Sequence, residues 1–152
     1  MSTRIDPHAW AQLQAKDACR DLILDAADAV DQQDYAALVA LFCEDAVLVR
    51  PSGAALQGRS EIFASYAQKD PNRWTHHLVC NHRIHLSESG QTAHSRCKVL
   101  LYVSDKRLEM GLQGRLASPN HQIGTMDDEL VKTEAGWKIR KRTAWFDLVT
   151  PT

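Results

Sequence analysis

The chain has 152 residues, of which 44% are hydrophobic and 24% are charged, and its formal net charge is −1 at pH 7. This length predicts one domain over residues 1–152 that buries a core without help from disulfides or a metal. The balanced charge argues against nucleic-acid and membrane-surface partners, and no apolar run approaches the ~18 residues of a membrane span.

The first third of the chain has helical periodicity. The pair Asp6-Pro7 is typical of a helix start, and apolar residues then recur at helical spacing to about Asp31. Asp34 is expected to cap a second helix over residues 35–42.

A short strand is predicted over residues 45–53, which end in a proline-glycine turn. A third helix is predicted over residues 60–68, where Phe63 and Tyr66 are among its apolar residues. The pair Asp70-Pro71 is expected to end it.

The second half changes to strand periodicity. Four β-rich runs cover residues 74–86, 92–103, 121–133 and 137–149, and residues 104–120 hold either a frayed strand or a flexible loop. Helices followed by strands with hairpin-length connections predict an α+β fold. We expect a cone-shaped, curved antiparallel sheet wrapped over three N-terminal helices, with a pocket for a small ligand inside.

The cysteines and the N-terminus bear on the compartment. Cys19, Cys43, Cys80 and Cys97 form no C-x-x-C pair and lie in segments expected to be buried. We interpret them as small core residues in a reducing compartment. The first 14 residues contain no apolar stretch typical of a secretory signal, so a cytoplasmic protein is expected.

Four stretches of the chain carry motifs of a known family. They are "AVDQQDYAALVALFCEDAV", "GRSEI", "THHLVCN" and "DDELVKTEAGWKIRKR". In this order they resemble the SnoaL-like group of the nuclear-transport-factor-2-like superfamily, over nearly the whole chain. The superfamily includes dehydratases, dehydrochlorinases, isomerases, polyketide cyclases, β subunits of ring-hydroxylating dioxygenases and non-catalytic modules, so the fold does not choose the function.

The resemblance implies two catalytic positions. Several eliminating enzymes of the superfamily use an aspartate from the first helix and a histidine from the first long strand, which correspond to Asp31 and His77. A tyrosine that serves in some dehydratases is replaced here by Ala26, and Met126 stands where the family often has another tyrosine. Both departures argue against a tyrosine-assisted dehydration.

The chemistry of this pair suits proton transfer. A carboxylate at the end of a helix opposes the helix dipole and is partly desolvated, so the pKa of Asp31 is expected to be raised. Alternatively, Asp31 is a solvated acid that helps to end the helix. An imidazole exchanges protons near neutral pH, and a carboxylate that fixes one nitrogen of His77 leaves the other as a base.

Histidine spacing argues against a metal site. His82 and His85 fall on opposite faces of the strand over residues 74–86, and four-residue spacing separates His77, Asn81 and His85 by ~13 Å each. We predict neither a metal nor a cofactor.

The same strand presents a conflict of faces. His77 shares its face with polar residues, whereas Leu78, Cys80 and Ile84 lie on the other face. If His77 points into a pocket, either a bulge shifts the register after it or the apolar face packs on another subunit. We favour the second alternative, and expect a homo-oligomer, either a dimer or a trimer.

Further side chains are candidates for substrate binding. Arg142 either anchors an anionic or carbonyl oxygen or forms a surface salt bridge, and Asn81 either orients the substrate or satisfies backbone groups. Apolar and aromatic residues that either wall the pocket or belong to the plain core are Trp74, Phe63, Tyr66, Met126 and Trp145.

The sequence therefore predicts a cofactor-independent acid–base enzyme of the dehydratase, lyase or isomerase type. Its substrate is expected to be a small, apolar, cyclic or aromatic compound, from which His77 removes a proton with Asp31 as its partner. Two alternatives stay open. One is a ligand-binding or accessory subunit that resembles the small subunit of ring-hydroxylating dioxygenases, with an oxygenase large subunit as partner. The other is a polyketide-cyclase-like aldol cyclase.

Overall fold

A computed structural model describes residues 6–151; the other six, which include part of the stretch expected to lack a secretory signal, lie outside the described residues. The described part contains three helices and six strands. Two short strands lie between the second and third helices, and four long strands follow the third helix. These are α1 (Pro7–Asp31), α2 (Tyr35–Ala40), β1 (Phe42–Val49), β2 (Ala55–Gln57), α3 (Gly58–Ala67), β3 (Arg73–Leu86), β4 (Thr92–Asp105), β5 (Gln122–Thr133) and β6 (Gly136–Val149).

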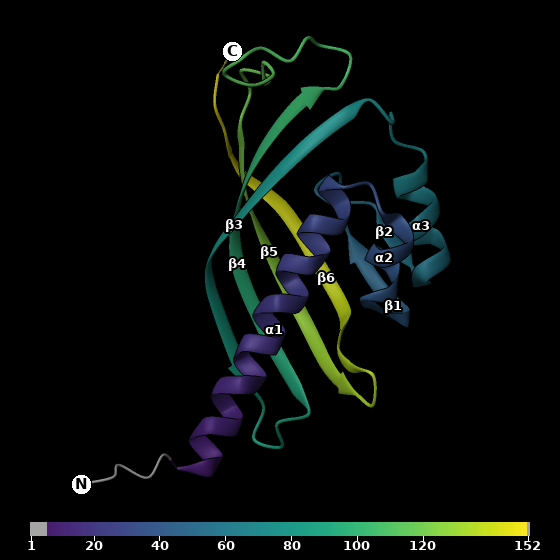
Figure 1. Cartoon of the computed structure of the whole chain (residues 1–152). Helices are drawn as coiled ribbons and strands as arrows, with labels where there is room; N and C mark the ends of the chain where they lie inside the picture. The colour runs from purple at the N-terminus through teal and green to yellow at the C-terminus, as the bar shows by residue number, and fades with distance from the viewer. Residues whose placement is uncertain (1–5, 152) are drawn as a thin grey trace, which may run out of the picture.

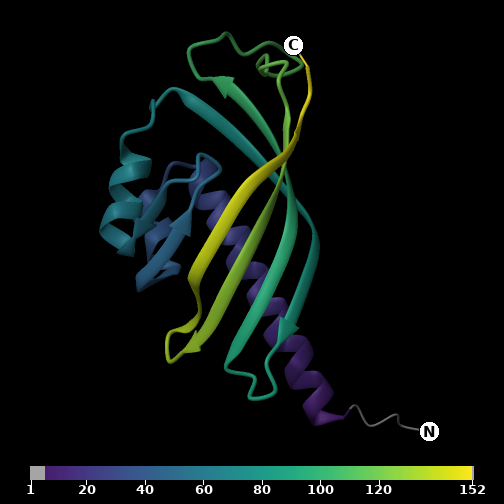
Figure 2. The ribbon, with the colours of Figure 1, turned by 180° about the vertical axis from the view of Figure 1, so that it is seen from behind.

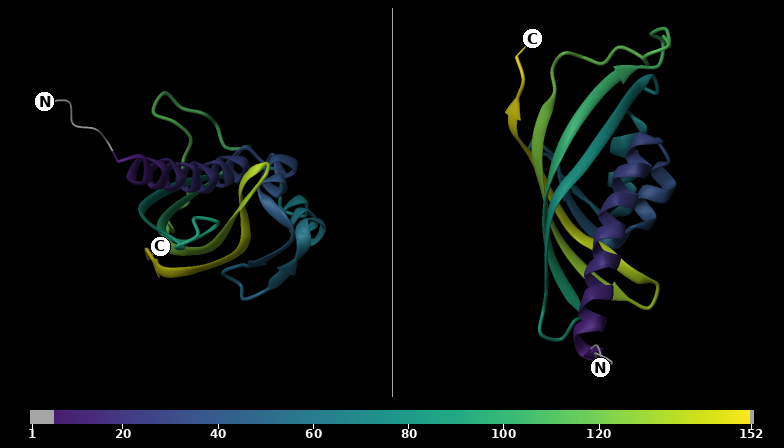
Figure 3. Two further views of the ribbon diagram at one scale, coloured as in Figure 1. Left: turned by 90° about the horizontal axis from the view of Figure 1, so that it is seen from below. Right: turned by 60° about the vertical axis from the view of Figure 1, so that its left-hand side comes forward.

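The strands form one curved sheet in the order β2-β1-β6-β5-β4-β3. Its neighbouring strands are antiparallel, except that β1 runs parallel to β6. Helix α1 lies along the concave side, and α2 and α3 lie together beside β1 and β2 (Figures 1 and 2). The sheet curls around α1 without closing, as the view from below shows (Figure 3). The predicted α+β cone is thus confirmed.

The helix starts follow from their capping residues. The Asp6 carboxylate accepts a hydrogen bond from the backbone N–H of His8 at 3.0 Å, and Asp34 accepts one from Ala37 at 3.0 Å. The prediction for α1 is confirmed at both ends. The second helix ends at Ala40, before the predicted end, because Phe42 already pairs with β6 as the first residue of β1.

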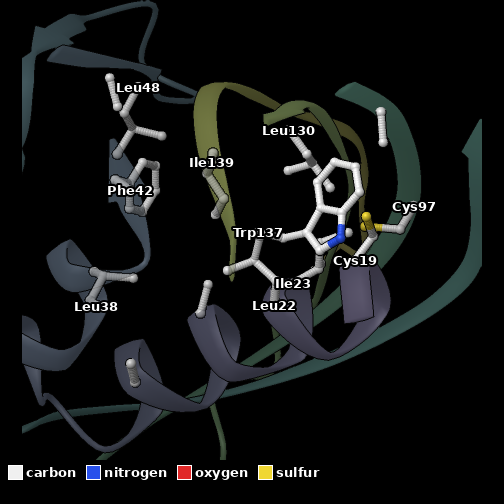
Figure 4. Packing of buried hydrophobic residues seen from close by; sticks show 14 of the residues in the cluster. Cys19, Leu22, Ile23, Leu38, Phe42, Leu48, Cys97, Leu130, Trp137 and Ile139 are labelled. Carbon is white, nitrogen blue, oxygen red and sulfur yellow. The ribbon is translucent and has the colours of Figure 1, made fainter. Parts of the chain in front are cut away.

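A hydrophobic core fills the space between α1 and the sheet. Cys19, Leu22 and Ile23 of α1 pack against a cluster that includes Leu130 of β5 and Ile139 of β6 (Figure 4). Burial of each large apolar side chain contributes about 1.5–3 kcal/mol to stability. This core holds α1 against the sheet. It thereby fixes the positions of the residues that follow the core along α1 and along the strands.

The four cysteines differ in burial. Cys19 and Cys97 are fully buried, Cys43 is half-buried and Cys80 is exposed. The prediction of four core cysteines is therefore wrong for Cys80, which lies on the outer face of β3.

A β-bulge in β3 explains part of the conflict of faces. The register against β4 shifts between Cys80 and Arg83, where Asn81 has a positive φ of 54°. Before the bulge the inward residues include His77, and after it they include Ile84. The bulge accounts for both of these residues, but Leu78 and Cys80 stay exposed on the outer face, so the subunit contact that we favoured stays a prediction.

The segment between β4 and β5 is irregular. Residues 106–121 lack a helix or strand and carry only isolated bridges, of which Ser104 with Ala117 is one. Of the two alternatives for this region, the loop is therefore correct. Among residues 6–151, no helix is long and apolar enough to cross a membrane.

Candidate active site

A cavity of about 540 Å³ lies beyond the core, between the last two turns of α1 and the sheet. Along α1 the inward side chains shrink from Leu22 and Ile23 in the core to Ala26 and Ala27 at the cavity. On the sheet, Gly124 of β5 also lines the space. Small residues on both sides keep the cavity open, and its volume is in the range of pockets for small organic molecules.

Asp31 and His77 contact each other at this cavity. The carboxylate Oδ1 of Asp31 lies 2.5 Å from Nδ1 of His77, and Oδ2 accepts the backbone N–H of His77 at 2.7 Å. The Thr75 hydroxyl donates to Oδ1 at 2.8 Å. His77 lines the cavity, whereas Asp31 stands behind it at the end of α1. Sequence positions 46 residues apart thus meet because α1 packs on β3.

The hydrogen bonds determine the charge of Asp31. Burial alone would raise its pKa, but the hydrogen bonds and charge of His77, together with the Thr75 hydroxyl, lower the pKa of Asp31 below the usual 3.8. The expectation of a raised pKa is therefore wrong, because three donors outweigh desolvation. Asp31 is a carboxylate at neutral pH.

An anionic Asp31 fixes the tautomer of His77. A carboxylate can only accept, so the proton between them belongs to Nδ1 of His77. The other ring nitrogen, Nε2, forms no hydrogen bond to the described residues. In the neutral imidazole this tautomer leaves Nε2 as the nitrogen without a proton, and Asp31 is a counter-ion for the imidazolium that proton uptake would create.

Arg142 lies in the cavity wall and not on the surface. Its Nε and Nη2 donate to both oxygens of Asp128, at 2.7 and 2.9 Å. Arg142 is 6% exposed and Asp128 is fully buried. Burial would lower the pKa of Arg142, but the Asp128 carboxylate raises it. The surface salt bridge is excluded, and the guanidinium keeps further N–H donors that Asp128 does not use.

The remaining predicted residues separate into two groups. Tyr66, Met126 and Trp145 line the cavity. Phe63 does not, because its position on α3 leaves it 42% exposed. Trp74 is also a correction. It does not line the cavity, because its odd spacing from His77 puts it on the outer face of β3, where its ring meets that of His76 edge to face at 4.7 Å between centroids.

Asn81 is a correction as well. It occupies the bulge in β3, is exposed and does not line the cavity. The bulge also turns His82 inward, where neither ring nitrogen forms a hydrogen bond to the described residues. No group of three or more His, Cys, Asp or Glu side chains in residues 6–151 is arranged to hold a metal ion.

Several cavity residues escaped the sequence prediction. Thr75 could have been found, because strand parity places it on the face of His77. Arg50, Lys69 and Arg73 also line the cavity, but they come from separate turns and a strand start, where no periodicity marks them. Tyr35, at the start of α2, stacks against Tyr66 at 5.5 Å between ring centroids.

Comparisons with known proteins agree with the family resemblance seen in the sequence and with the observed fold. A family model described as a SnoaL-like domain matches residues 11–143. Among curated protein sequences, none matches the chain. Many solved structures do match, and three illustrate the range.

The first is described as a candidate scytalone dehydratase from Novosphingobium aromaticivorans DSM 12444. Its sequence identity is 21% and its TM-score is 0.75, and the match covers 93% of this chain and 89% of the other. A hexachlorocyclohexane dehydrochlorinase, LinA type 2, has 17% identity, a TM-score of 0.76 and coverage of 93% and 90%. A candidate aromatic ring hydroxylase from Novosphingobium aromaticivorans DSM has 25% identity, a TM-score of 0.72 and coverage of 92% and 94%.

Proposed function

The chain belongs to the SnoaL-like domain family, within the nuclear-transport-factor-2-like fold, and we propose that its cavity is the active site of an acid–base enzyme of the lyase or isomerase type. The observation that carries this proposal is the contact between Asp31 and His77 at the cavity wall. Similarity to structures described as a dehydratase and a dehydrochlorinase supports an elimination.

In the proposed reaction, Nε2 of His77 takes a proton from a carbon of the substrate. The electron pair of that C–H bond forms a carbon–carbon double bond, and a leaving group on the next carbon departs with its own electron pair. Asp31 stabilises the imidazolium that results and holds its orientation. An isomerisation would instead return the proton to another carbon.

Arg142 is the candidate for stabilising negative charge in the transition state. Its guanidinium is buried, held by Asp128, and lines the same cavity as His77. A donor fixed in advance in a site of low dielectric stabilises developing charge without having to reorganise. The apolar walls, which include Met126 and Leu101, fit a compound with a cyclic or aromatic body.

The elimination of 5-nitrobenzisoxazole tests the proposal, because it needs only a base in an apolar cavity. The carbon-bound proton beside the nitrogen moves to the base, the C–H electrons form a nitrile, and the N–O bond breaks to leave a phenolate. His77→Ala should lower kcat/KM by about 10²–10⁴-fold. Asp31→Asn should lower it by about 10–100-fold, since one charged hydrogen bond is lost.

His76→Ala is the matched control. His76 lies next to His77 but on the exposed outer face of β3, so its removal should leave kcat/KM unchanged. Circular dichroism of each variant separates a catalytic effect from misfolding. A wild-type rate no higher than that of His77→Ala would contradict the proposal.

A second candidate function is a non-catalytic or accessory subunit. It is favoured by the 25% identity to a candidate aromatic ring hydroxylase. In that case the cavity would bind a ligand without turnover, and wild type and His77→Ala would eliminate 5-nitrobenzisoxazole at the same rate. Co-purification with an iron-containing oxygenase subunit would support this function.

A further inference from the structure

Three cationic side chains line the cavity together with His77. Arg50 directly follows β1, Lys69 lies between α3 and β3, and Arg73 is the first residue of β3. The three residues line the same cavity because α3 packs on β1 and a short loop leads from α3 to the start of β3 (Figure 1). We refer to Arg50, Lys69 and Arg73 as the cationic rim.

The charge of the cationic rim is not neutralised by ion pairs. Among residues 6–151, no carboxylate oxygen lies within 4.0 Å of a side-chain nitrogen of the rim. Asp70 also lines the cavity, but its ion pair is with Arg107, at 3.7 Å. In contrast, Arg142 in the same cavity is compensated by Asp128. A positive charge thus remains available to a ligand at the rim.

Tyr66 brings two of these cations together. Nζ of Lys69 lies 4.1 Å from the centre of the Tyr66 ring, and the guanidinium carbon of Arg50 lies 5.3 Å from it. The Arg50 guanidinium also donates to the Ser65 hydroxyl, which fixes its direction. Burial, followed by the charges of Arg50 and Arg73, lowers the pKa of Lys69 to about 8. Like charges are held close here, and a bound anion would relieve their repulsion.

We propose that the substrate carries a carboxylate, which the cationic rim binds while the apolar body of the substrate extends toward His77. Apolar residues of the same cavity support this division, since Leu48, Val99 and Leu101 also line it. The substrate class is then a cyclic or aromatic carboxylic acid. This inference rests on the proposed function only for the reaction at His77; the binding of the anion is independent of it.

Cinnamate and cinnamamide form a matched pair of ligands for the test. They have the same shape, but only cinnamate carries a negative charge. Isothermal titration calorimetry at about pH 7 should show that cinnamate binds at least about tenfold more tightly than cinnamamide. Lys69→Gln should remove most of this preference, and Lys69→Arg should retain it.

Lys132→Gln is the matched control, because Lys132 is exposed near the end of β5 and its loss changes the net charge equally. It should keep the preference. The affinity of wild type for cinnamate should fall between about pH 7 and about pH 9, as Lys69 loses its proton. The other charged groups that face Lys69 are Arg50, Arg73 and Asp70, and Tyr66 stays neutral because burial raises its pKa.

The outcomes are distinct from those of the elimination assay. The preference for cinnamate should persist in His77→Ala, even though that variant is expected to lose turnover. Equal affinity for the two ligands, no binding of cinnamate, or the same preference in Lys69→Gln as in wild type would overturn the carboxylate site. None of these results would bear on the role of His77 as a base.

Discussion

At the residue scale, the proposed chemistry depends on how firmly Asp31 is held. Its two oxygens accept three hydrogen bonds, from the Thr75 hydroxyl, the His77 backbone and the His77 ring. Two of these donors belong to the residue that Asp31 orients. The backbone contact fixes the distance between α1 and β3, and the ring contact then fixes the tautomer, so one carboxylate both positions and charges the base.

The lowered pKa of Asp31 makes a prediction for stability. Because the pKa is below 3.8 in the folded state, the carboxylate stabilises the fold at every pH above its unfolded value. That contribution is lost as pH falls through the folded pKa. Asp31→Asn should therefore reduce the free energy of unfolding by about 1–3 kcal/mol at neutral pH. Urea denaturation should show that the difference between variant and wild type shrinks below about pH 4. If the difference in the free energy of unfolding stayed constant with pH, the lowered pKa of Asp31 would be contradicted.

The sequence predicted this site unevenly. Motif position identified Asp31 and His77, and the structure brings them into contact. The sequence could not identify Lys69, because a lysine beside a turn resembles any solvated surface residue. Only the fold brings Arg50 and Arg73 close to it. Nor could the pKa of Asp31 be predicted, since its hydrogen-bond donors come from a strand 44 and 46 residues away.

At the element scale, β-bulges decide which side chains enter the cavity. In β3 the register shifts after Cys80, and in β6 Arg140 is the extra residue between the partners of Glu129 and Leu130. The second shift lets both Ile139 and Arg142 face inward. Simple alternation would place Arg142 outside if Ile139 is inside. Periodicity located the four long strands, whereas the first strand, predicted over residues 45–53, is Phe42–Val49, and β2 was not predicted. A single extra residue changes the phase of a strand, which a period of two does not reveal.

Asn81 provides a test of the bulge in β3. Its φ of 54° is left-handed, a conformation that asparagine and glycine tolerate and β-branched residues do not. Asn81→Val should lower the free energy of unfolding by about 1–2 kcal/mol. Asn81→Gly, the matched control, should stay within about 0.5 kcal/mol of wild type. Equal stability of the two variants in urea denaturation would argue against this backbone conformation.

At the scale of the whole molecule, one helix and one sheet divide their interface into two parts. The first part is packed by Ile23 and its neighbours, and the second is left open by Ala26 and Ala27. The fold was predictable, since helices followed by hairpin strands have few arrangements. The position of the cavity was not, because it depends on where small residues on α1 meet small residues on β5 and β6. The homo-oligomer stays a prediction.

Filling the cavity should therefore separate function from stability. Ala144 of β6 is half-buried and lines the cavity, so Ala144→Phe should occupy the space of the substrate. We expect kcat/KM for 5-nitrobenzisoxazole to fall at least about tenfold, while the free energy of unfolding changes by less than about 1.5 kcal/mol. Ala135→Phe, in the exposed turn before β6, should leave both unchanged. An unchanged rate in Ala144→Phe would place the reaction elsewhere.

The central claim is that Nε2 of His77 is the base inside this cavity, and chemical rescue of His77→Ala tests it most directly. Removing the side chain leaves a space of imidazole shape beside the Asp31 carboxylate. Added imidazole should restore the elimination of 5-nitrobenzisoxazole by at least about tenfold, with saturation, because a bound base has a high effective concentration. A wild-type rate in His77→Ala without imidazole, or a response no greater than the reaction of imidazole in buffer, would contradict the claim.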